Sequence, residues 1–226
     1  MKRIRISIDG PAGAGKSTVA RALANKLSYV YLDTGALYRT VALAAKKEGI
    51  SMDDSRRLGE LARRVKIRLV REGNIEFVEL DGKRIGQEIR TPELGRVASQ
   101  ISKVSGVRQA LLSLQRDLAS SGGVVMEGRD IGSVVLPDAE LKFFLVASFK
   151  ERAKRRWKEL VERGEKVELS LIEDEVQKRD KVDSEREVSP LIKPKGAIEI
   201  DTTDLTIDEI VARMYRFAKE RESAGA

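Results

Sequence analysis

The chain of 226 residues contains no cysteine and no histidine, and aromatic residues make up only 4% of it. Without cysteine, it can form no disulfide and offers no thiolate nucleophile. Without histidine, it lacks the commonest general base and the commonest metal ligand at neutral pH. Catalysis would therefore depend on carboxylates, lysine, arginine, hydroxyls and backbone amides. Phosphoryl transfer suits that set, because it relies on positioning and charge stabilisation.

Long apolar segments are also missing from the chain. No run of eighteen apolar residues occurs, so we expect no membrane span. The N-terminal segment lacks a signal-peptide pattern, and we expect a cytoplasmic location. The formal net charge of +7 favours anionic partners, but the few aromatic residues argue against base stacking, so we expect no nucleic-acid partner. Because no expected helix has an apolar face left over to contact a second copy of the chain, we expect a monomer.

A glycine-rich segment fills every fixed position of the phosphate-binding pattern G-x-x-x-x-G-K-[ST]. Its residues are Gly10, Pro11, Ala12, Gly13, Ala14, Gly15, Lys16, Ser17 and Thr18. Glycines let the backbone approach phosphate closely, and the unpaired N–H groups of the following helix attract the anion. Lys16 can place its charge on the β- and γ-phosphates, and the Ser17 hydroxyl can bind Mg²⁺. The segment therefore predicts a site for ATP and Mg²⁺.

The pattern around this loop is that of an α/β protein. Short apolar strands are expected at 3–8, 29–32, 124–126, 141–146 and 197–200. Helices are expected at 36–47, 91–103, 106–120, 148–163, 170–181 and 206–221, with another that is capped by Asp53 or Asp54 and ends at Arg64. This alternation predicts the three-layer α/β/α fold of P-loop NTPases around a parallel five-stranded sheet.

A hairpin pattern interrupts the alternation. Residues 65–70 and 75–80 alternate in polarity on either side of a Glu-Gly-Asn turn, and a third short strand is expected near 83–85. These segments predict a small antiparallel sheet inserted into the α/β pattern. At the end of the chain, residues 222–226 are expected to form a frayed tail.

Four further segments carry arginine and aspartate near the expected strand ends and on flanking helices. They are residues 33–39, Ser99 with Arg108, residues 127–132 and residues 179–186. Together with the loop and the β insertion, they closely resemble bacterial cytidylate kinases, the CMP/dCMP kinases of the P-loop nucleoside monophosphate kinase superfamily, over nearly the whole chain. The resemblance implies transfer of the γ-phosphoryl group of ATP to CMP or dCMP, with Mg²⁺, giving the diphosphate and ADP.

The resemblance also implies a domain organisation. It makes residues 1–226 a single nucleoside monophosphate kinase domain. Within it, an acceptor-binding region is expected at about 34–120, with the β insertion at about 65–90, and a helical lid at about 152–187.

The same resemblance implies roles for individual residues. Acceptor-binding positions are Thr34, Arg39, Ser99, Arg108, Arg129, Asp130, Arg179, Asp183 and Arg186. Of these, it implies phosphate ligands at Arg39 and Arg129, cytosine readers at Ser99, Arg108 and Asp130, and sugar or phosphate contacts at Arg179, Asp183 and Arg186. The implied catalytic set is Lys16, Arg129, Arg155 and Arg156, the last two in the lid. Val182 stands where some relatives have arginine, which leaves the number of lid arginines open.

The chemistry of the side chains agrees with these roles. Arginine binds phosphate in a bidentate way and keeps its charge. A carboxylate such as Asp130 can accept a hydrogen bond from the exocyclic amine of cytosine. Uracil has a carbonyl there, and a buried group left unpaired costs about 1–3 kcal/mol, so UMP would be disfavoured by roughly tenfold to a few hundredfold. Taken singly, however, Arg39 could be a solvated surface cation, and Arg179 and Asp183 could be mere helix neighbours.

Several strand-end carboxylates compete for the magnesium site. Glu127 ends a buried apolar strand and could hold Mg²⁺ through water. Asp9 and Asp33 also follow strands, and Asp9 could instead fix the phosphate loop. Because acids at such positions are also common helix caps, the residues alone do not decide among the three.

Three rival functions remain possible from the residues alone. Another small-molecule kinase of the same fold could act on UMP, dTMP, shikimate or a coenzyme precursor. A nucleic-acid-dependent ATPase would use the net positive charge, but the chain has few aromatic residues for a stacking groove. A catalytically inactive regulatory module is disfavoured by the intact Lys16 and Ser17.

Overall fold

The computed structural model describes residues 3–72 and 75–224. Two compact units make up the fold. Unit 1 combines Met1–Leu32 with Ser121–Ala226, and unit 2 is the continuous segment Asp33–Ser120.

Unit 1 is built on a five-stranded sheet with the order β2-β6-β1-β7-β8. The strands are β1 (Arg5–Asp9), β2 (Val30–Asp33), β6 (Val124–Gly128), β7 (Leu141–Val146) and β8 (Ile198–Asp201). β1 pairs in parallel with β6 and β7, and β7 pairs in parallel with β8. Every residue of β6 is buried, as expected for a central strand of a covered parallel sheet. The predicted α/β fold with its parallel five-stranded sheet is confirmed.

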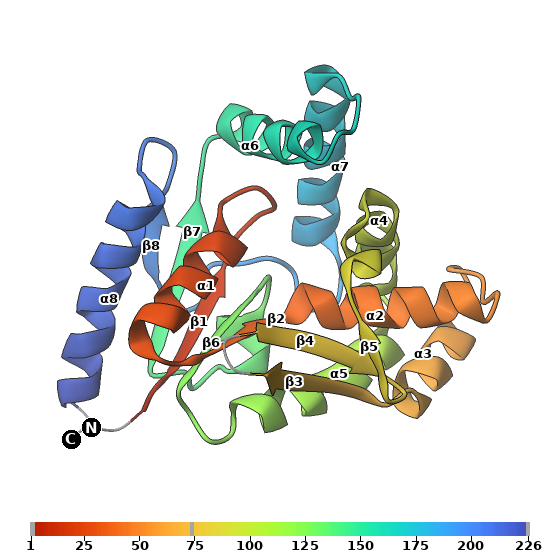
Figure 1. Cartoon of the computed structure of the whole chain (residues 1–226), viewed down its shortest axis with the longest axis horizontal. Helices are drawn as coiled ribbons and strands as arrows, with labels where there is room; N and C mark the ends of the chain where they lie inside the picture. The colour runs from red at the N-terminus through yellow and green to blue at the C-terminus, as the bar shows by residue number, and fades with distance from the viewer. Residues whose placement is uncertain (1–2, 73–74, 225–226) are drawn as a thin grey trace. The chain divides into compact units, whose positions relative to one another are not determined.

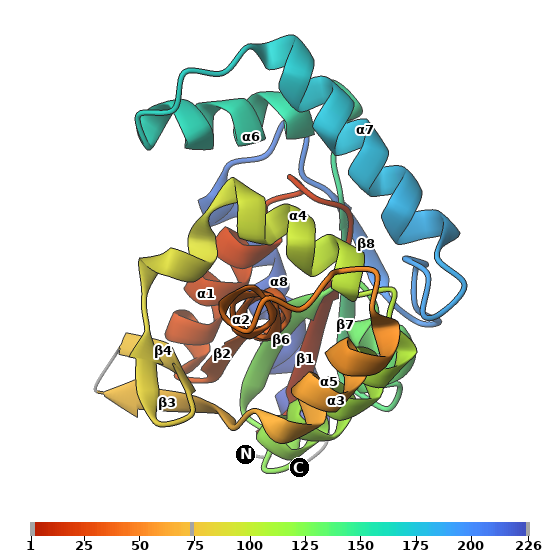
Figure 2. The same ribbon diagram turned by 90° about the vertical axis from the view of Figure 1, so that its right-hand side faces the viewer.

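Helices α1 (Lys16–Leu27) and α8 (Ile207–Ala224) pack together against this sheet (Figure 1). Their apolar side chains share one core with alternate residues of β1, such as Ile6 and Ile8. Helices α6 (Phe149–Glu162) and α7 (Leu169–Glu185) lie side by side around a small core of their own (Figure 2). Within residues 3–72 and 75–224, no helix has both the length and the apolar character needed to cross a bilayer.

Unit 2 contains the predicted three-stranded antiparallel sheet. The strands β3 (Ile67–Glu72), β4 (Ile75–Leu80) and β5 (Lys83–Ile85) are joined in that order, so both hairpins expected from the sequence are confirmed. The helical elements of the unit are α2 (Thr34–Lys47), α3 (Ser55–Arg64), η1 (Gln87–Arg90), α4 (Pro92–Ile101) and α5 (Ser105–Ala119). One apolar core joins these helices to the small sheet.

Helices α3 and α5 cross unusually closely. A Cβ atom added at Gly106 would lie 3.0 Å from the Cα of Gly59, and one added at Gly59 would lie 3.3 Å from the Cα of Gly106. A side chain at either position would therefore require the facing helix to shift by a few tenths of an ångström.

Two sequence predictions at helix ends are wrong. The helix expected at 170–181 runs on to Glu185, so that Asp183 lies on it. The expected frayed tail is helical as far as Ala224, and residues 225–226 lie outside the described part of the chain. Glu222 is buried there and accepts a hydrogen bond from the Tyr29 hydroxyl, which also accepts one from the Ile4 N–H at 3.0 Å. A buried partner from the other end of the chain therefore keeps the last helical turn in place.

Candidate active site

The phosphate loop joins the end of β1 to the start of α1. Gly10 has a φ of 147°, and a Cβ atom at this position would lie 2.1 Å from the carbonyl oxygen of Leu145. Gly13 and Gly15 have φ values of 77° and 84°, in the left-handed region that glycine adopts without strain. Gly15 caps α1 without a side chain, so the first N–H groups of the helix remain available to an anion.

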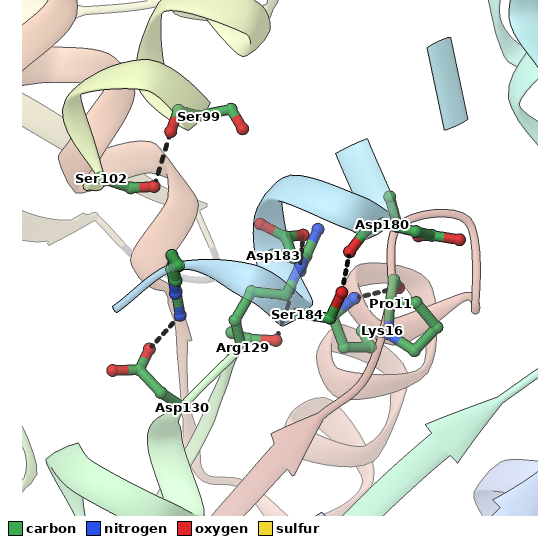
Figure 3. Close-up of polar contacts among 12 residues, drawn as sticks. Pro11, Lys16, Ser99, Ser102, Arg129, Asp130, Asp180, Asp183 and Ser184 are labelled. Atoms are coloured by element: carbon green, nitrogen blue, oxygen red, sulfur yellow. Dashed lines mark hydrogen bonds and ion pairs between the residues drawn. The ribbon is translucent and has the colours of Figure 1, made fainter. Parts of the chain in front are cut away.

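Lys16 is buried at the start of α1. Its Nζ donates a hydrogen bond of 2.7 Å to the carbonyl oxygen of Pro11, as Figure 3 shows. Burial, together with the positive charge of Arg129, lowers the pKa of Lys16 to about 7. A polyphosphate bound at the loop would therefore raise the pKa of Lys16 and favour its charged form.

Ser17 and Glu127 provide adjoining oxygen ligands. The Ser17 hydroxyl donates a hydrogen bond of 2.6 Å to Oε1 of Glu127, and the Tyr31 hydroxyl donates to the same oxygen at 3.2 Å. Among the described residues, no group of three or more acidic, histidine or cysteine side chains could hold a metal alone. A hydroxyl beside a single carboxylate suits Mg²⁺, which usually completes its shell with water and substrate phosphates.

The other two strand-end carboxylates are engaged differently. Asp9 is completely buried and accepts hydrogen bonds of 2.7 Å from the N–H groups of Ile131 and Gly132. Burial raises the pKa of Asp9 to about 6, although these N–H groups oppose the shift. Asp33 caps α2 by accepting from the N–H of Ala36 at 3.0 Å. Asp9 thus fixes the turn after β6 rather than the phosphate loop.

That turn, Ile131–Val135, is a single turn of π-helix that the sequence did not reveal. It begins directly after Arg129 and Asp130, the residues expected to bind the acceptor. Because Asp9 on β1 binds two of its N–H groups, the segment after β6 is fixed to the neighbouring strand.

An alternating set of arginines and aspartates lies between this segment and α7. Arg129 donates a hydrogen bond of 2.7 Å from Nε to Asp183, as Figure 3 shows, and Nη2 of Arg186 lies 3.6 Å from Asp130. Burial alone would raise the pKa of Asp183, but the charges of Arg129, Arg179 and Arg186 lower it below its usual value. The structure therefore brings together all five acceptor-site residues that the sequence predicted in unit 1.

Arg155 and Arg156 of α6 differ in their surroundings. Arg155 donates to the hydroxyl of Thr202 at 3.0 Å and to its carbonyl oxygen at 2.5 Å. The Thr202 hydroxyl lies within hydrogen-bond distance of two carbonyl oxygens, that of Val146 at 3.0 Å and that of Ala14 in the phosphate loop at 3.2 Å. Arg156 pairs with Glu159 one turn along the same helix. Of the two, only Arg155 is linked to the loop by hydrogen bonds among the described residues.

Arg152 was missed in the sequence. Its guanidinium forms a bidentate ion pair with Asp180 of α7, with distances of 2.9 and 2.6 Å, and donates to the carbonyl oxygen of Ala12 at 3.1 Å. It thus joins α6, α7 and the phosphate loop. One feature of the sequence could have pointed to Arg152: it lies in the first turn of the helix that Ser148 caps. The Ser148 hydroxyl accepts from the Glu151 N–H at 3.3 Å.

The remaining acceptor-site candidates belong to unit 2. Thr34 is buried at the start of α2, and Arg39 pairs with Asp33 at 2.8 Å. Ser99 lies on α4, where its carbonyl oxygen accepts from the Ser102 hydroxyl at 2.8 Å (Figure 3). Arg108 of α5 is buried, and its Nη1 donates to the carbonyl oxygen of Ser102 at 3.1 Å. Ser102 is thus bonded to both expected base readers of this unit.

Comparisons with known proteins agree with this site. The sequence model of a family described as cytidylate kinase matches residues 6–220. A cytidylate kinase from Caldanaerobacter subterraneus is 50% identical over 212 residues, covering 94% of this chain and 93% of its own. One from Bacillus thuringiensis is 49% identical over 213 residues, covering 94% and 95%. An uncharacterised protein from Eubacterium ventriosum has a similar fold, with a TM-score of 0.52, 16% identity, and coverage of 97% and 99%.

Proposed function

Because the chain belongs to the cytidylate kinase family, we propose that it transfers the γ-phosphoryl group of ATP to CMP or dCMP. The observation that supports this most is the charge cluster of unit 1. Lys16 is buried at the phosphate loop, and burial together with the positive charges of Arg129 and Arg179 lowers its pKa. Such a cluster can stabilise the negative charge of two phosphate groups during transfer.

The chain's lack of histidine fits this reaction. An oxygen of the acceptor phosphate, already anionic at neutral pH, forms a bond to the γ-phosphorus of ATP while the bond from that phosphorus to the β,γ-bridging oxygen breaks. The products are a nucleoside diphosphate and ADP, and no side chain has to remove a proton. Lys16 would hold the donor phosphates, and Arg129 and Arg155 would stabilise the charge on the transferred group. Arg155 and Arg156 both pair with a glutamate of their own helix, and Arg156 is the weaker candidate because only Arg155 also bonds to Thr202, beside the phosphate loop, among the described residues.

We propose the same division of labour for the acceptor that the sequence predicted. Arg39 and Arg129 would bind its phosphate, and Asp130 would accept from the cytosine amine. The proposed set is completed by Thr34, Ser99, Arg108, Arg179, Asp183 and Arg186. The ion pairs of Arg129 and Arg186 support the proposal, because they hold these guanidinium groups in defined positions.

Ser17 and Glu127 would hold Mg²⁺, with Glu127 acting directly or through water. When bound, the ion would neutralise part of the charge on the ATP phosphates. Tyr31 would orient the carboxylate of Glu127 by the hydrogen bond described above. The cytoplasmic location and the monomeric state rest on the sequence alone and stay predictions.

A coupled ADP-release assay with CMP, dCMP, UMP, AMP and dTMP tests the function. CMP and dCMP are expected to give the highest kcat/KM, with UMP lower by roughly tenfold to a few hundredfold for the reason given for Asp130. If UMP or dTMP is the best acceptor, the protein is a different kinase of this fold. Hydrolysis of ATP that depends on added nucleic acid and not on CMP would favour the ATPase alternative.

Binding of ATP is expected to take up a proton at pH 8. Lys16 has a pKa of about 7, so it is mostly neutral at pH 8, and the phosphates of ATP restore its charge by raising this pKa. Free ATP is itself fully deprotonated at that pH. Calorimetric titration in two buffers of different ionisation enthalpy should show an uptake of close to one proton, which falls at lower pH. A binding heat that does not depend on the buffer would contradict the assignment.

A further inference from the structure

The small antiparallel sheet of unit 2 has no part in the function proposed above, yet a groove lies beside it. The groove has a volume of about 840 Å³, within the ~300–1,000 Å³ typical of ligand sites. Its walls come from the end of α3, the start of β3, the β4–β5 turn and one face of α5. All of these elements belong to the continuous segment Asp33–Ser120.

Three exposed cations line this groove: Arg63, Lys66 and Arg68. Within residues 3–72 and 75–224, their side chains form no ion pair, unlike the nearby exposed Arg64, which pairs with Glu48 at 2.7 Å. The acidic residue of the lining, Asp81, accepts a hydrogen bond from the backbone N–H of Lys66 at 2.9 Å. The lining therefore carries three cations and one carboxylate, and its net positive charge favours an anionic occupant.

The groove lies beside the start of β3. This strand is at the edge of the sheet in the order β3-β4-β5, as Figure 2 shows. Lys66, Ile67 and Arg68 line the groove at the start of β3. From the described residues in the rest of the sheet, the lining includes the β4–β5 turn alone. A groove on a face of the sheet would also be lined by β4.

Backbone groups of β3 point away from β4, toward the outer side of the strand. The Asp81 N–H donates to the carbonyl oxygen of Lys66 at 2.9 Å, so these two residues form a hydrogen-bonded pair. Bonded and non-bonded pairs alternate along antiparallel strands, and Ile67 and Leu69 therefore turn their N–H and C=O groups away from β4. Such an edge can accept a further strand.

The opposite wall of the groove is apolar. Ala110 and Leu114 of α5, both partly buried, line it one turn apart on the helix. A strand placed beside β3 would point alternate side chains in opposite directions. Apolar side chains could then contact this wall while acidic ones reach the cations.

From these features we propose that the groove binds an extended acidic peptide segment, which adds a strand to the outer edge of β3. Its carboxylates would pair with Arg63, Lys66 and Arg68, and its apolar residues would pack on Ala110 and Leu114. A nucleotide or an RNA strand would use the cations but would leave the strand edge unpaired. The proposal does not depend on the phosphotransferase function.

The test measures fluorescence anisotropy of a labelled seven-residue peptide with glutamate at odd positions and valine or leucine between them, added to the full chain. We expect saturable binding that weakens with salt. Arg63→Glu and Lys66→Glu should each weaken it by about tenfold, corresponding to ~1.4 kcal/mol. The matched control is Arg57→Glu, which changes an exposed cation of α3 outside the groove and should leave binding unchanged. Kinase activity with CMP should be the same in all three variants.

Two further probes separate strand addition from simple charge attraction. The same peptide methylated on alternate backbone nitrogens cannot pair with β3 and should lose its binding, as should a peptide with lysine in place of glutamate. No binding of the first peptide, equal binding of the methylated one, or equal binding to Lys66→Glu would overturn the proposal. Displacement of the peptide by ATP or by a short RNA at comparable concentration would do the same, and would assign the groove to those ligands.

Discussion

Replacing Lys16 with alanine is expected to reduce phosphoryl transfer to every acceptor by about a thousandfold or more. The side chain is only 5% exposed, and its ammonium group is held at the phosphate loop by the Pro11 carbonyl. No other lysine lies on the loop, so its positive charge cannot be replaced from within the motif. The measurement is kcat for ADP release with CMP and with dCMP at saturating ATP.

Lys47→Ala serves as the control for this substitution. Lys47 is exposed at the end of α2, and its replacement should change kcat by less than about twofold. A Lys16→Ala protein that melts like the unmodified chain and keeps more than a tenth of its turnover would show that the lysine is not needed for transfer.

Substitutions of Asp130 are expected to change the choice of acceptor. Asp130→Ala removes the carboxylate that we propose accepts from the cytosine amine, so the CMP/UMP ratio of kcat/KM should fall by at least about tenfold. Asp130→Asn should lower it further, because the amide can donate to the C4 carbonyl of uracil. The asparagine also keeps an oxygen near Arg186, which lies 3.6 Å from Asp130. The assay is the acceptor panel with each variant.

Thermal melting of both variants separates a change in specificity from a loss of fold. Asp130 is buried, and a damaged site would lower activity with CMP and UMP together without altering their ratio. Asp174→Asn is the matched control, since Asp174 is exposed on α7. An unchanged CMP/UMP ratio in a well-folded Asp130→Asn protein would remove this residue from base recognition.

Most of the fold could be predicted because its signals are local. The strand Leu141–Val146 is found as expected, and the hairpins of the small sheet follow from alternating polarity around turn residues. The phosphate loop was equally clear, because its function requires fixed residue types at fixed spacing. In each case the physical cause lies within one short, continuous segment of the chain.

The missed features depend on partners far away in the sequence. Arg152 meets Asp180 28 residues later, Tyr31 meets Glu127 96 residues later, and Tyr29 meets Glu222 193 residues later. Glu222 lies in a polar C-terminal segment that resembles a solvated tail, and its burial is compensated by Tyr29 from the other end of the chain together with Lys219 of the same helix. The spacing of apolar residues along the sequence cannot reveal such pairs, because neither polar partner changes the apolar pattern of its own segment.

The discontinuity of unit 1 has a consequence for the order in which the protein folds. β1 pairs with β6 and β7, whose residues follow it by more than a hundred positions, so β1 has both of its neighbours only once Val146 has been synthesised. Unit 2 is one uninterrupted stretch that is complete once Ser120 has been made. Contacts close in sequence form sooner than distant ones. During translation, unit 2 can therefore form its core before β1, which leads into the phosphate loop, has both neighbouring strands to pair with.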